Sequence, residues 1–328
     1  MKLPHRRQFL HLAAGAAVLP GVSHIAWAQT YPTRPIMLAV PFSAGGGSDI
    51  TARVVAEKMS KTLGQQIVVE NRPGAGGTVA MRQVAKSLPD GYTLVLGNPG
   101  TLAIAPTAHS NLGYDPRQDF SPVGFIGWTQ FGLFVHPSVP ARSVQELIAL
   151  ARKEPGKLNF GSAGTGSGTH LTGELFASTA AIKLVHIPYK GVAPAINDLL
   201  GGHLTMVVTG LPPAVGHVRD GAIRALAVTG STRSGIFPDV PTVAESGLPG
   251  YESVQTFGIL APKGTPRPII DKLNGALREA LALNEVKVKL AVDGTEPLPG
   301  TPEDYAAAID REETKWSKLI KQIGVKAE

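Results

Sequence analysis

The sequence predicts an α/β protein of two lobes, with parallel-rich sheets flanked by helices. Short apolar runs alternate with helical patterns along the whole chain, and this order is typical of parallel strands covered on both faces. The 38 glycines and 27 prolines are spread between the apolar runs, as in a folded, loop-rich protein. A chain of roughly 300 residues is longer than one core usually organises, which favours two lobes.

The first 28 residues have the features of a secretory signal peptide. Arg6 and Arg7 precede an apolar run, Leu12 to Val22, and a small-residue exit, Ala26-Trp27-Ala28, follows it. The run is too short to remain as a membrane span. We expect cleavage before Gln29 and export to the periplasm, by the twin-arginine or the Sec route, since paired arginines are common in both.

Composition excludes several classes of protein. The chain has 31 basic and 25 acidic residues; three basic residues lie in the signal peptide, which leaves 28 against 25, or +3. That charge is too mild for a nucleic-acid binder, although it favours an anionic solute. The absence of cysteine excludes disulfides, thiolate metal sites, a cysteine nucleophile and a lipoprotein anchor. We expect no cofactor, no metal and no nucleic-acid partner, and a monomer free in the periplasm.

The first half of the mature chain begins with a buried apolar run followed by an amphipathic helix. In the helix, Ala52, Val55, Met59 and Leu63 recur at helical spacing. The expected strands of this half are 36–40, 67–69, 93–96, 123–127 and 131–136, and the expected helices are 48–63 and 78–86.

The second half repeats this alternation and then returns to the first. Ser143 and Glu146 form a capping box that opens a helix ending near Lys153. The expected strands are 158–161, 184–187, 205–209, 224–228 and 255–261, with helices starting near residues 169, 193, 212, 265 and 301. Because no long linker separates the halves, we expect lobe I to comprise residues 29–130 and 255–328, and lobe II to comprise residues 131–254.

Glycine-rich turns follow three of the predicted strands, where ligands bind in open α/β sheets. They are Pro41–Asp49, Asn71–Thr78 and Gly161–Thr169. A helix that starts at such a turn offers unpaired N–H groups and a positive dipole end, and these bind a carboxylate without an arginine. The first and third turns, one per lobe, could hold the two ends of a diacid across a cleft. Taken singly, such a turn is more often a tight connection than a ligand site.

Motifs of common enzymes are missing. The turn at Gly74–Val79 begins like a dinucleotide fingerprint but has Val79 where glycine or alanine is needed. The sequence has no P-loop, no serine with glycine two residues away on both sides, and no metal-ligand spacing among its nine histidines. We therefore expect no catalysis. Arg53 and Arg72 are expected to be solvated or paired with acids rather than to hold a ligand.

Several blocks of the sequence resemble one receptor family, in order across the mature chain. They include Pro41-Phe42-x-x-Gly45-Gly46-x-x-Asp49, Glu70-Asn71-Arg72-Pro73-Gly74, His186-Ile187-Pro188-Tyr189-Lys190-Gly191 and Pro238-Asp239-Val240-Pro241-Thr242. On these blocks the chain resembles the Bug-type extracytoplasmic receptors of tripartite tricarboxylate transporters. The resemblance implies a two-lobed periplasmic binding fold of the Venus-flytrap, type II-like kind. Such a receptor captures a small carboxylate, whether a di- or tricarboxylate, an aromatic acid or an amino acid, for a membrane permease.

The resemblance also implies which residues face the ligand. From lobe I they are Phe42, Ser43, Gly46, Ser48 and Asp49, and from lobe II they are Ser162, Ala163, Gly164 and Ser167. The remaining walls would come from Asn98, Gly100, Thr101 and Thr209. The segment Gln255-Thr256-Phe257-Gly258 departs from the family, which often has tryptophan before the glycine. Two alternatives stay open: a periplasmic sensor receptor of a signalling system, and a secreted hydrolase.

Overall fold

The computed structural model describes residues 31–292 and 294–323, and the described residues from Pro32 on form one compact unit. The predicted signal peptide, residues 1–28, lies outside the described residues. No helix in the described ranges is long and apolar enough to cross a membrane.

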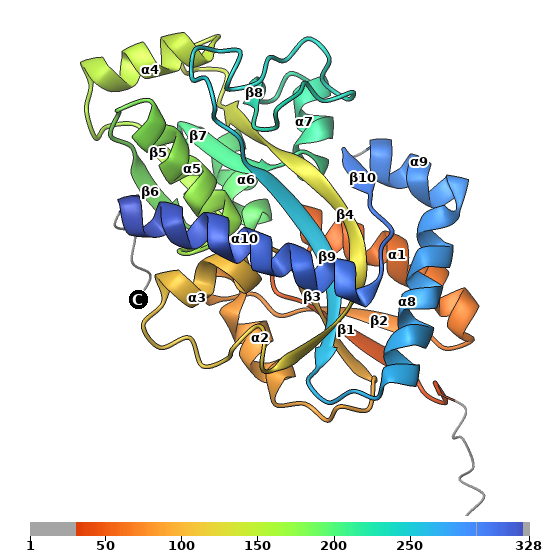
Figure 1. Ribbon diagram of the computed structural model, residues 1–328. Coiled ribbons are helices and arrows are strands. Elements are labelled where there is room, and N and C mark those ends of the chain that lie inside the picture. The colour runs from red at the N-terminus through yellow and green to blue at the C-terminus, as the bar shows by residue number, and fades with distance from the viewer. Residues whose placement is uncertain (1–30, 293, 324–328) are drawn as a thin grey trace, which may run out of the picture. The chain divides into compact units, whose positions relative to one another are not determined.

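The described residues form ten strands in one continuous α/β sheet (Figure 1). The strands are β1 (Ile36–Val40), β2 (Ile67–Asn71), β3 (Thr93–Gly97), β4 (Phe120–Val135), β5 (Asn159–Ser162), β6 (Val185–Pro188), β7 (Met206–Gly210), β8 (Arg224–Val228), β9 (Val254–Pro262) and β10 (Thr295–Pro297). Their order is β2-β1-β3-β9-β4-β7-β5-β6, with β8 and β10 also paired to β4.

Helices alternate with the strands as the sequence predicted. The α-helices are α1 (Gly47–Leu63), α2 (Thr78–Ala85), α3 (Ala105–Ala108), α4 (Val144–Lys153), α5 (Gly168–Thr179), α6 (Val192–Leu200), α7 (Val215–Arg219), α8 (Arg267–Ala282), α9 (Asn284–Val292) and α10 (Pro302–Ile323). Single turns of other helix types are η1 (Ala75–Gly77), η2 (Gly100–Ile104) and η3 (Pro212–Ala214). The predicted fold class is confirmed, and most elements lie within a residue or two of their predicted bounds.

Strand β4 corrects one prediction. The sequence predicted two strands, at 123–127 and 131–136, whereas the structure has a single long strand whose register shifts twice against β9 and once against β8. Polar residues between the two apolar runs hid the continuity, but they are buried and bonded: Thr129 Oγ1 donates to Gly294 O at 2.8 Å and Gln130 Nε2 donates to Thr232 O at 3.0 Å. Because these hydrogen bonds satisfy the two buried polar side chains, the strand can continue through the core.

The partners of β4 change at these polar residues. Up to Gln130 the strand pairs antiparallel with β9, and from Phe131 it pairs with β7 and β8. The parallel pairs lie to either side, with β1 between β2 and β3, and β5 between β6 and β7. Strand β4 therefore joins two groups of parallel strands, and the carboxyl ends of β1 and β5 lead into the first and third glycine-rich turns.

Helix α10 crosses in front of β4 and β9 (Figure 1). Its Tyr305 packs with Phe125 and Leu260 in one hydrophobic cluster, while Trp316 packs with Ile104 and Leu171 in another. This packing requires glycine at position 258, because a methyl group there would overlap the Tyr305 ring.

We expect Gly258→Ala to lower the free energy of unfolding by about 1–3 kcal/mol, because overpacking a rigid core costs that much. Gly275→Ala is the matched control: Gly275 lies inside α8 and a methyl group there meets no atom within 4 Å. In this control the stability should rise by about 0.5–1 kcal/mol, as helix propensity predicts. Urea denaturation measures both changes, and equal stabilities of the two variants would contradict this packing.

Candidate functional site

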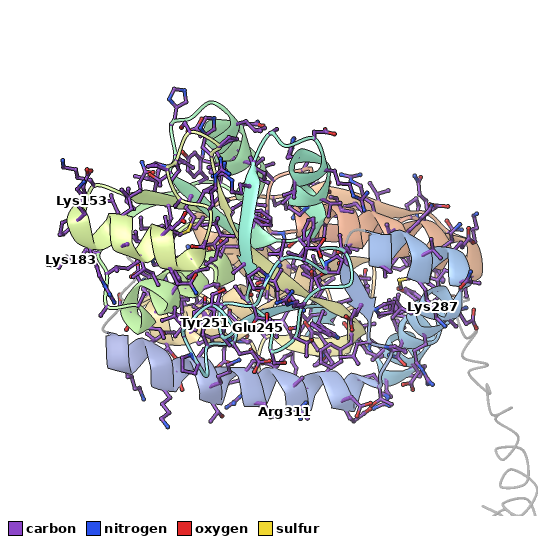
Figure 2. The ribbon with its side chains drawn as sticks, turned by 90° about the horizontal axis from the view of Figure 1, so that it is seen from above. Lys153, Lys183, Glu245, Tyr251, Lys287 and Arg311 are labelled. Carbon is purple, nitrogen blue, oxygen red and sulfur yellow. The ribbon has the colours of Figure 1, made fainter. Side chains whose placement is uncertain are left out.

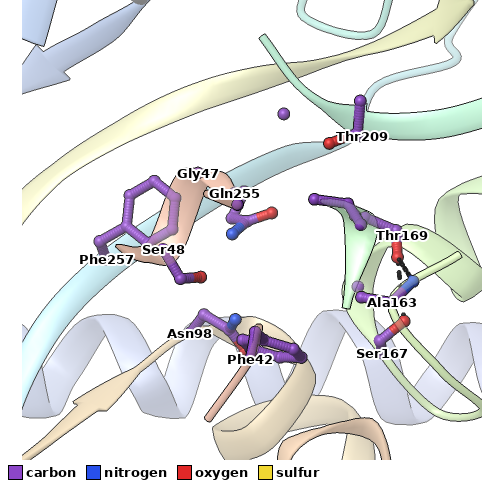
Figure 3. A pocket seen from close by; sticks show the side chains of 14 residues that line it. Phe42, Gly47, Ser48, Asn98, Ala163, Ser167, Thr169, Thr209, Gln255 and Phe257 are labelled. Atoms are coloured by element: carbon purple, nitrogen blue, oxygen red, sulfur yellow. Dashed lines mark hydrogen bonds between the residues drawn. The ribbon is translucent and has the colours of Figure 1, made fainter. Parts of the chain in front are cut away.

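A pocket lies where the first and third glycine-rich turns meet the chain around β7 and β9 (Figure 3). The space between its residues is about 410 Å³, open solvent at its mouth included. The lining comprises Phe42, Gly46, Gly47, Ser48, Asn98, Ala163, Ser167, Gly168, Thr169, Val192, Thr209, Gly210, Gln255 and Phe257.

The start of α1 forms the first wall. Gly46 is the N-cap and supplies no side-chain cap, so no side chain takes up the amides of the first turn. The N–H groups of Gly47 and Ser48 also have no preceding helical carbonyl to bond, as at any helix start. They are therefore free to donate to a ligand in the pocket, helped by the positive end of the helix dipole.

Asp49 supports this wall from behind rather than lining the pocket. It accepts hydrogen bonds from Gly45 N at 3.0 Å, from Arg53 Nε at 2.9 Å and from Asn71 Nδ2 at 3.0 Å. Burial opposes ionisation of this carboxyl, but the hydrogen bonds from Arg53, Gly45 and Asn71 outweigh it, so the pKa of Asp49 lies below its ordinary value. The carboxylate of Asp49 is thus bonded to the first glycine-rich turn and its neighbours, Arg53 and Asn71, rather than to the pocket.

The start of α5 forms the opposite wall, with the same chemistry. Ser167 caps the helix by accepting from His170 N at 3.2 Å. Thr169 Oγ1 lies 3.0 Å from Ser167 Oγ and accepts from Ala163 N at 2.8 Å. These bonds fix the turn, while the N–H groups of Gly168 and Thr169, two lining residues at the helix start, have no preceding helical carbonyl to bond. Two helix N-termini therefore open on one space.

Neighbouring segments pack tightly against the turns of the two walls. A methyl group at Gly76 would overlap Thr165 O, and one at Gly100 would lie 2.9 Å from Gly168 N. Gly191, at φ +140°, approaches Ser43 so closely that any side chain would overlap it. Glycine is needed here because backbone meets backbone.

The remaining lining is apolar or neutral. Phe42, Ala163 and Val192 pack together as one small hydrophobic cluster, and all three line the pocket. Phe257 and Gln255 lie two residues apart on β9 and both reach the pocket (Figure 3). Asn98 holds its own turn by accepting from Thr101 N at 3.1 Å.

No lining residue has an ionisable side chain. Charged side chains such as Lys153, Lys183, Lys287 and Arg311 are exposed at the edges of the molecule (Figure 2). As predicted, the two arginines near the turns pair with acids: Arg53 with Asp49 at 2.9 Å and Arg72 with Glu70 at 3.1 Å. Within the described ranges no cluster of three or more His, Cys, Asp or Glu residues could hold a metal ion.

Seven of the thirteen predicted site residues line the pocket: Phe42, Gly46, Ser48, Asn98, Ala163, Ser167 and Thr209. The other six are not part of the lining: Ser43, Asp49, Gly100, Thr101, Ser162 and Gly164. The lining adds Gly47, Gly168, Thr169, Val192, Gly210, Gln255 and Phe257. Most of these neighbour predicted residues, and the departure at Gln255 to Gly258 was itself a signal. For Val192 the sequence signal was weaker: the residue directly follows the Tyr189-Lys190-Gly191 block.

A serine and a histidine meet behind the third glycine-rich turn. Ser162 Oγ lies 2.6 Å from His186 Nε2, and the His186 ring stacks on His170 with centroids 3.9 Å apart. Burial, and then the neighbouring His170, lower the pKa of His186 to about 3. A histidine of so low a pKa is a weak general base. Ser162 is fully buried outside the pocket lining, so this pair positions the turn rather than attacks a substrate.

Comparison with known proteins places this geometry among receptors. A sequence profile described as a tripartite tricarboxylate transporter family receptor matches residues 51–325. The protein BugT of Bordetella pertussis is 38% identical over 93% of this chain and 94% of its own. The solved periplasmic binding protein BugD is 37% identical, with a TM-score of 0.88 over 91% of this chain and all of its own.

Two similar solved structures hold an acid. Rpa4515 of R. palustris, solved with adipate, is 38% identical, with a TM-score of 0.88 over 90% of this chain and 99% of its own. MatC of Rhodopseudomonas palustris, solved with bound malate, is 33% identical, with a TM-score of 0.86 over 88% of this chain and all of its own. The likeness extends over nearly the whole of each protein.

The free energy of unfolding should fall as pH drops from about 6.5 toward 4. An unfolded histidine titrates near pH 6.5, whereas folded His186 stays neutral down to about pH 3. In this window the unfolded chain binds one more proton, which lowers stability by up to about 1.4 kcal/mol per pH unit. In His186→Gln this contribution should vanish, whereas the control His203→Gln, at an exposed histidine, should keep the wild-type slope. Urea denaturation at several pH values measures the free energy of unfolding. The same pH dependence in the wild type and in His186→Gln would contradict a lowered pKa of His186.

Proposed function

The chain belongs to the tripartite tricarboxylate transporter family of receptors, and we propose that it captures a small carboxylate outside the cytoplasm for delivery to a membrane permease. One observation carries the proposal: two helix N-termini open on one pocket that has no ionisable side chain in its lining. Unbonded amides and dipole ends are the groups that bind an anion without a basic residue. The adipate and malate bound by the two similar structures are acids of this kind.

The same pocket is suited to bind a ligand without catalysing a reaction on it. Among the described residues near the pocket, one serine hydroxyl bonds a histidine ring; this Ser162–His186 pair lies behind the turn, and its histidine is too weakly basic to activate the hydroxyl. The lining also lacks any carboxylate, thiol or amine that could act as nucleophile or general acid. We therefore favour a binding receptor over the secreted hydrolase. A sensor role would use the same pocket and differ only in the protein that reads the bound state.

Closure of two lobes on the ligand is part of the proposal. Lobe I would comprise residues 29–130 and 255–328, and lobe II residues 131–254. Support comes from the change of partners along β4 at Gln130 and Phe131, and from the start of β9 at Val254, beside the same point. The α1 and α5 walls lie on opposite sides of this division, so a diacid held by both would favour the closed state.

A thermal-shift screen of the ligand-stripped protein tests capture directly. At a thousandfold excess over its Kd, a bound acid adds about 4 kcal/mol to the free energy of unfolding. We expect a rise in Tm of several degrees with at least one class among mono-, di- and tricarboxylates, aromatic acids and amino acids. A rise only with sugars, nucleotides or metal ions would overturn the carboxylate assignment.

Gly47→Ala should weaken binding of that acid about tenfold, or about 1.4 kcal/mol. The added methyl group meets Pro212, Pro213 and Phe257 at 3.7–4.0 Å, so the fold accommodates it, but it narrows the pocket beside the α1 amides. Gly216→Ala, in α7 and with no atom within 4 Å of its methyl group, is the control and should bind as the wild type does. Calorimetric titration gives both affinities; an unchanged Kd in Gly47→Ala would argue against this wall.

The affinity for a fully ionised acid should also change less than about twofold between pH 7 and 9. No lining side chain titrates in that range, because none is ionisable. Titrations at pH 7, 8 and 9 check this expectation. A tenfold change would reveal a charged residue that takes part in binding.

A further inference from the structure

Thr209, the fourth residue of β7, has a hydroxyl that the fold leaves without a partner. The residue is 1% exposed, and its Oγ1 makes no hydrogen bond within the described part of the chain. The residue lines the pocket, and Figure 3 shows its oxygen directed inward, toward the side of Gln255 and Ser48. A buried hydroxyl without a partner loses its hydrogen bonds to water and gains none in return.

Two of the three other hydroxyls in the pocket lining differ from this one: Ser167 Oγ caps α5, and Thr169 Oγ1 accepts from Ala163 N, so the folded chain already uses both. The third, Ser48, belongs to the start of α1, where a carboxylate would bind. Thr209 Oγ1 has no such use. It belongs to neither α1 nor α5, and so it lies apart from the two places where carboxylates would bind. The Thr209 hydroxyl is thus a third place in the pocket where a polar group of the ligand could bind, besides the starts of α1 and α5.

From this placement, and resting on the proposed capture of a carboxylate, we propose that Thr209 recognises an oxygen substituent on the ligand. The ligand is then a dicarboxylate that carries a hydroxyl or keto oxygen on its chain. Its carboxylates bind at the starts of α1 and α5, its methylene groups contact Phe42, Val192 and Phe257, and its extra oxygen bonds Thr209 Oγ1. A site that pairs a ligand hydroxyl discriminates strongly against the analogue that lacks it, because the buried group is then left unpaired.

Two other threonines provide a test of this reasoning. The hydroxyls of Thr51 in α1 and Thr295 in β10 are likewise buried without a partner, but neither residue lines the pocket. Thr295 is 1% exposed and lies in a strand, as Thr209 does, so Thr295→Val is the matched control for Thr209→Val. Both changes replace a hydroxyl by a methyl group of the same shape.

The experiment compares pairs of acids that differ by one oxygen: succinate and malate, glutarate and 2-hydroxyglutarate, adipate and 2-hydroxyadipate. Calorimetric titration gives each Kd for the wild type, Thr209→Val, Thr209→Ser and Thr295→Val. We expect the wild type, Thr209→Ser and Thr295→Val to prefer the hydroxylated member of at least one pair by tenfold or more. In Thr209→Val this preference should shrink to less than threefold.

The Tm of the ligand-free variants separates recognition from a structural role. A threonine kept for the fold would leave Thr209→Val less stable, whereas recognition predicts a ligand-free Tm equal to that of the wild type or higher. The inference is overturned if the wild type binds both members of every pair equally, or if Thr209→Val keeps the preference. In those cases the acids still bind, and carboxylate capture stands. If none of the six acids binds, capture of dicarboxylates fails, and this inference fails with it.

Discussion

The pocket depends on backbone amides that two helices leave unbonded at their first turns. A helix start has N–H groups without intrahelical acceptors, and the dipole makes that end positive. Because α1 and α5 both begin at the pocket, an acid can be neutralised there without lysine or arginine. The side chains of the lining are then free to be apolar or neutral, as Phe42, Val192 and Gln255 are. Charge is supplied by the main chain, and selectivity by the side chains.

The fold brings these two helix starts together through glycine and through one long strand. Strand β4 pairs first with β9 and then with β7, so both groups of parallel strands share a single support. Gly76, Gly100 and Gly191 each lie where another turn would collide with a Cβ atom. Asp49 and the Ser162–His186 pair then brace the two turns from behind. The polar residues nearest the pocket therefore divide into those that hold its walls and those, such as Thr209, that are left for the ligand.

Periodic and local features were predictable from the sequence, and features that depend on side-chain reach were not. The capping box at Ser143, the helix starts after glycine-rich turns and the pairing of Arg53 with an acid follow from short-range rules, and all occur. Helix α9 was missed because Val286 and Leu290 are buried while Val288 is exposed, which blurs the helical period. Ser162 and Val192 show the limit for the site: adjacent turns put the first behind the wall and the second in it. Which residue of a turn faces the pocket is determined only by the fully folded backbone.

A crystal structure of the mature protein with a bound dicarboxylate tests the central claim most directly. If the account is right, carboxylate oxygens lie about 2.7–3.2 Å from the amide nitrogens of Gly47 or Ser48 at one end. At the other end they lie as close to those of Gly168 or Thr169, with no lysine or arginine side chain in contact. A carboxylate held by a basic side chain, or bound away from both helix starts, would contradict it.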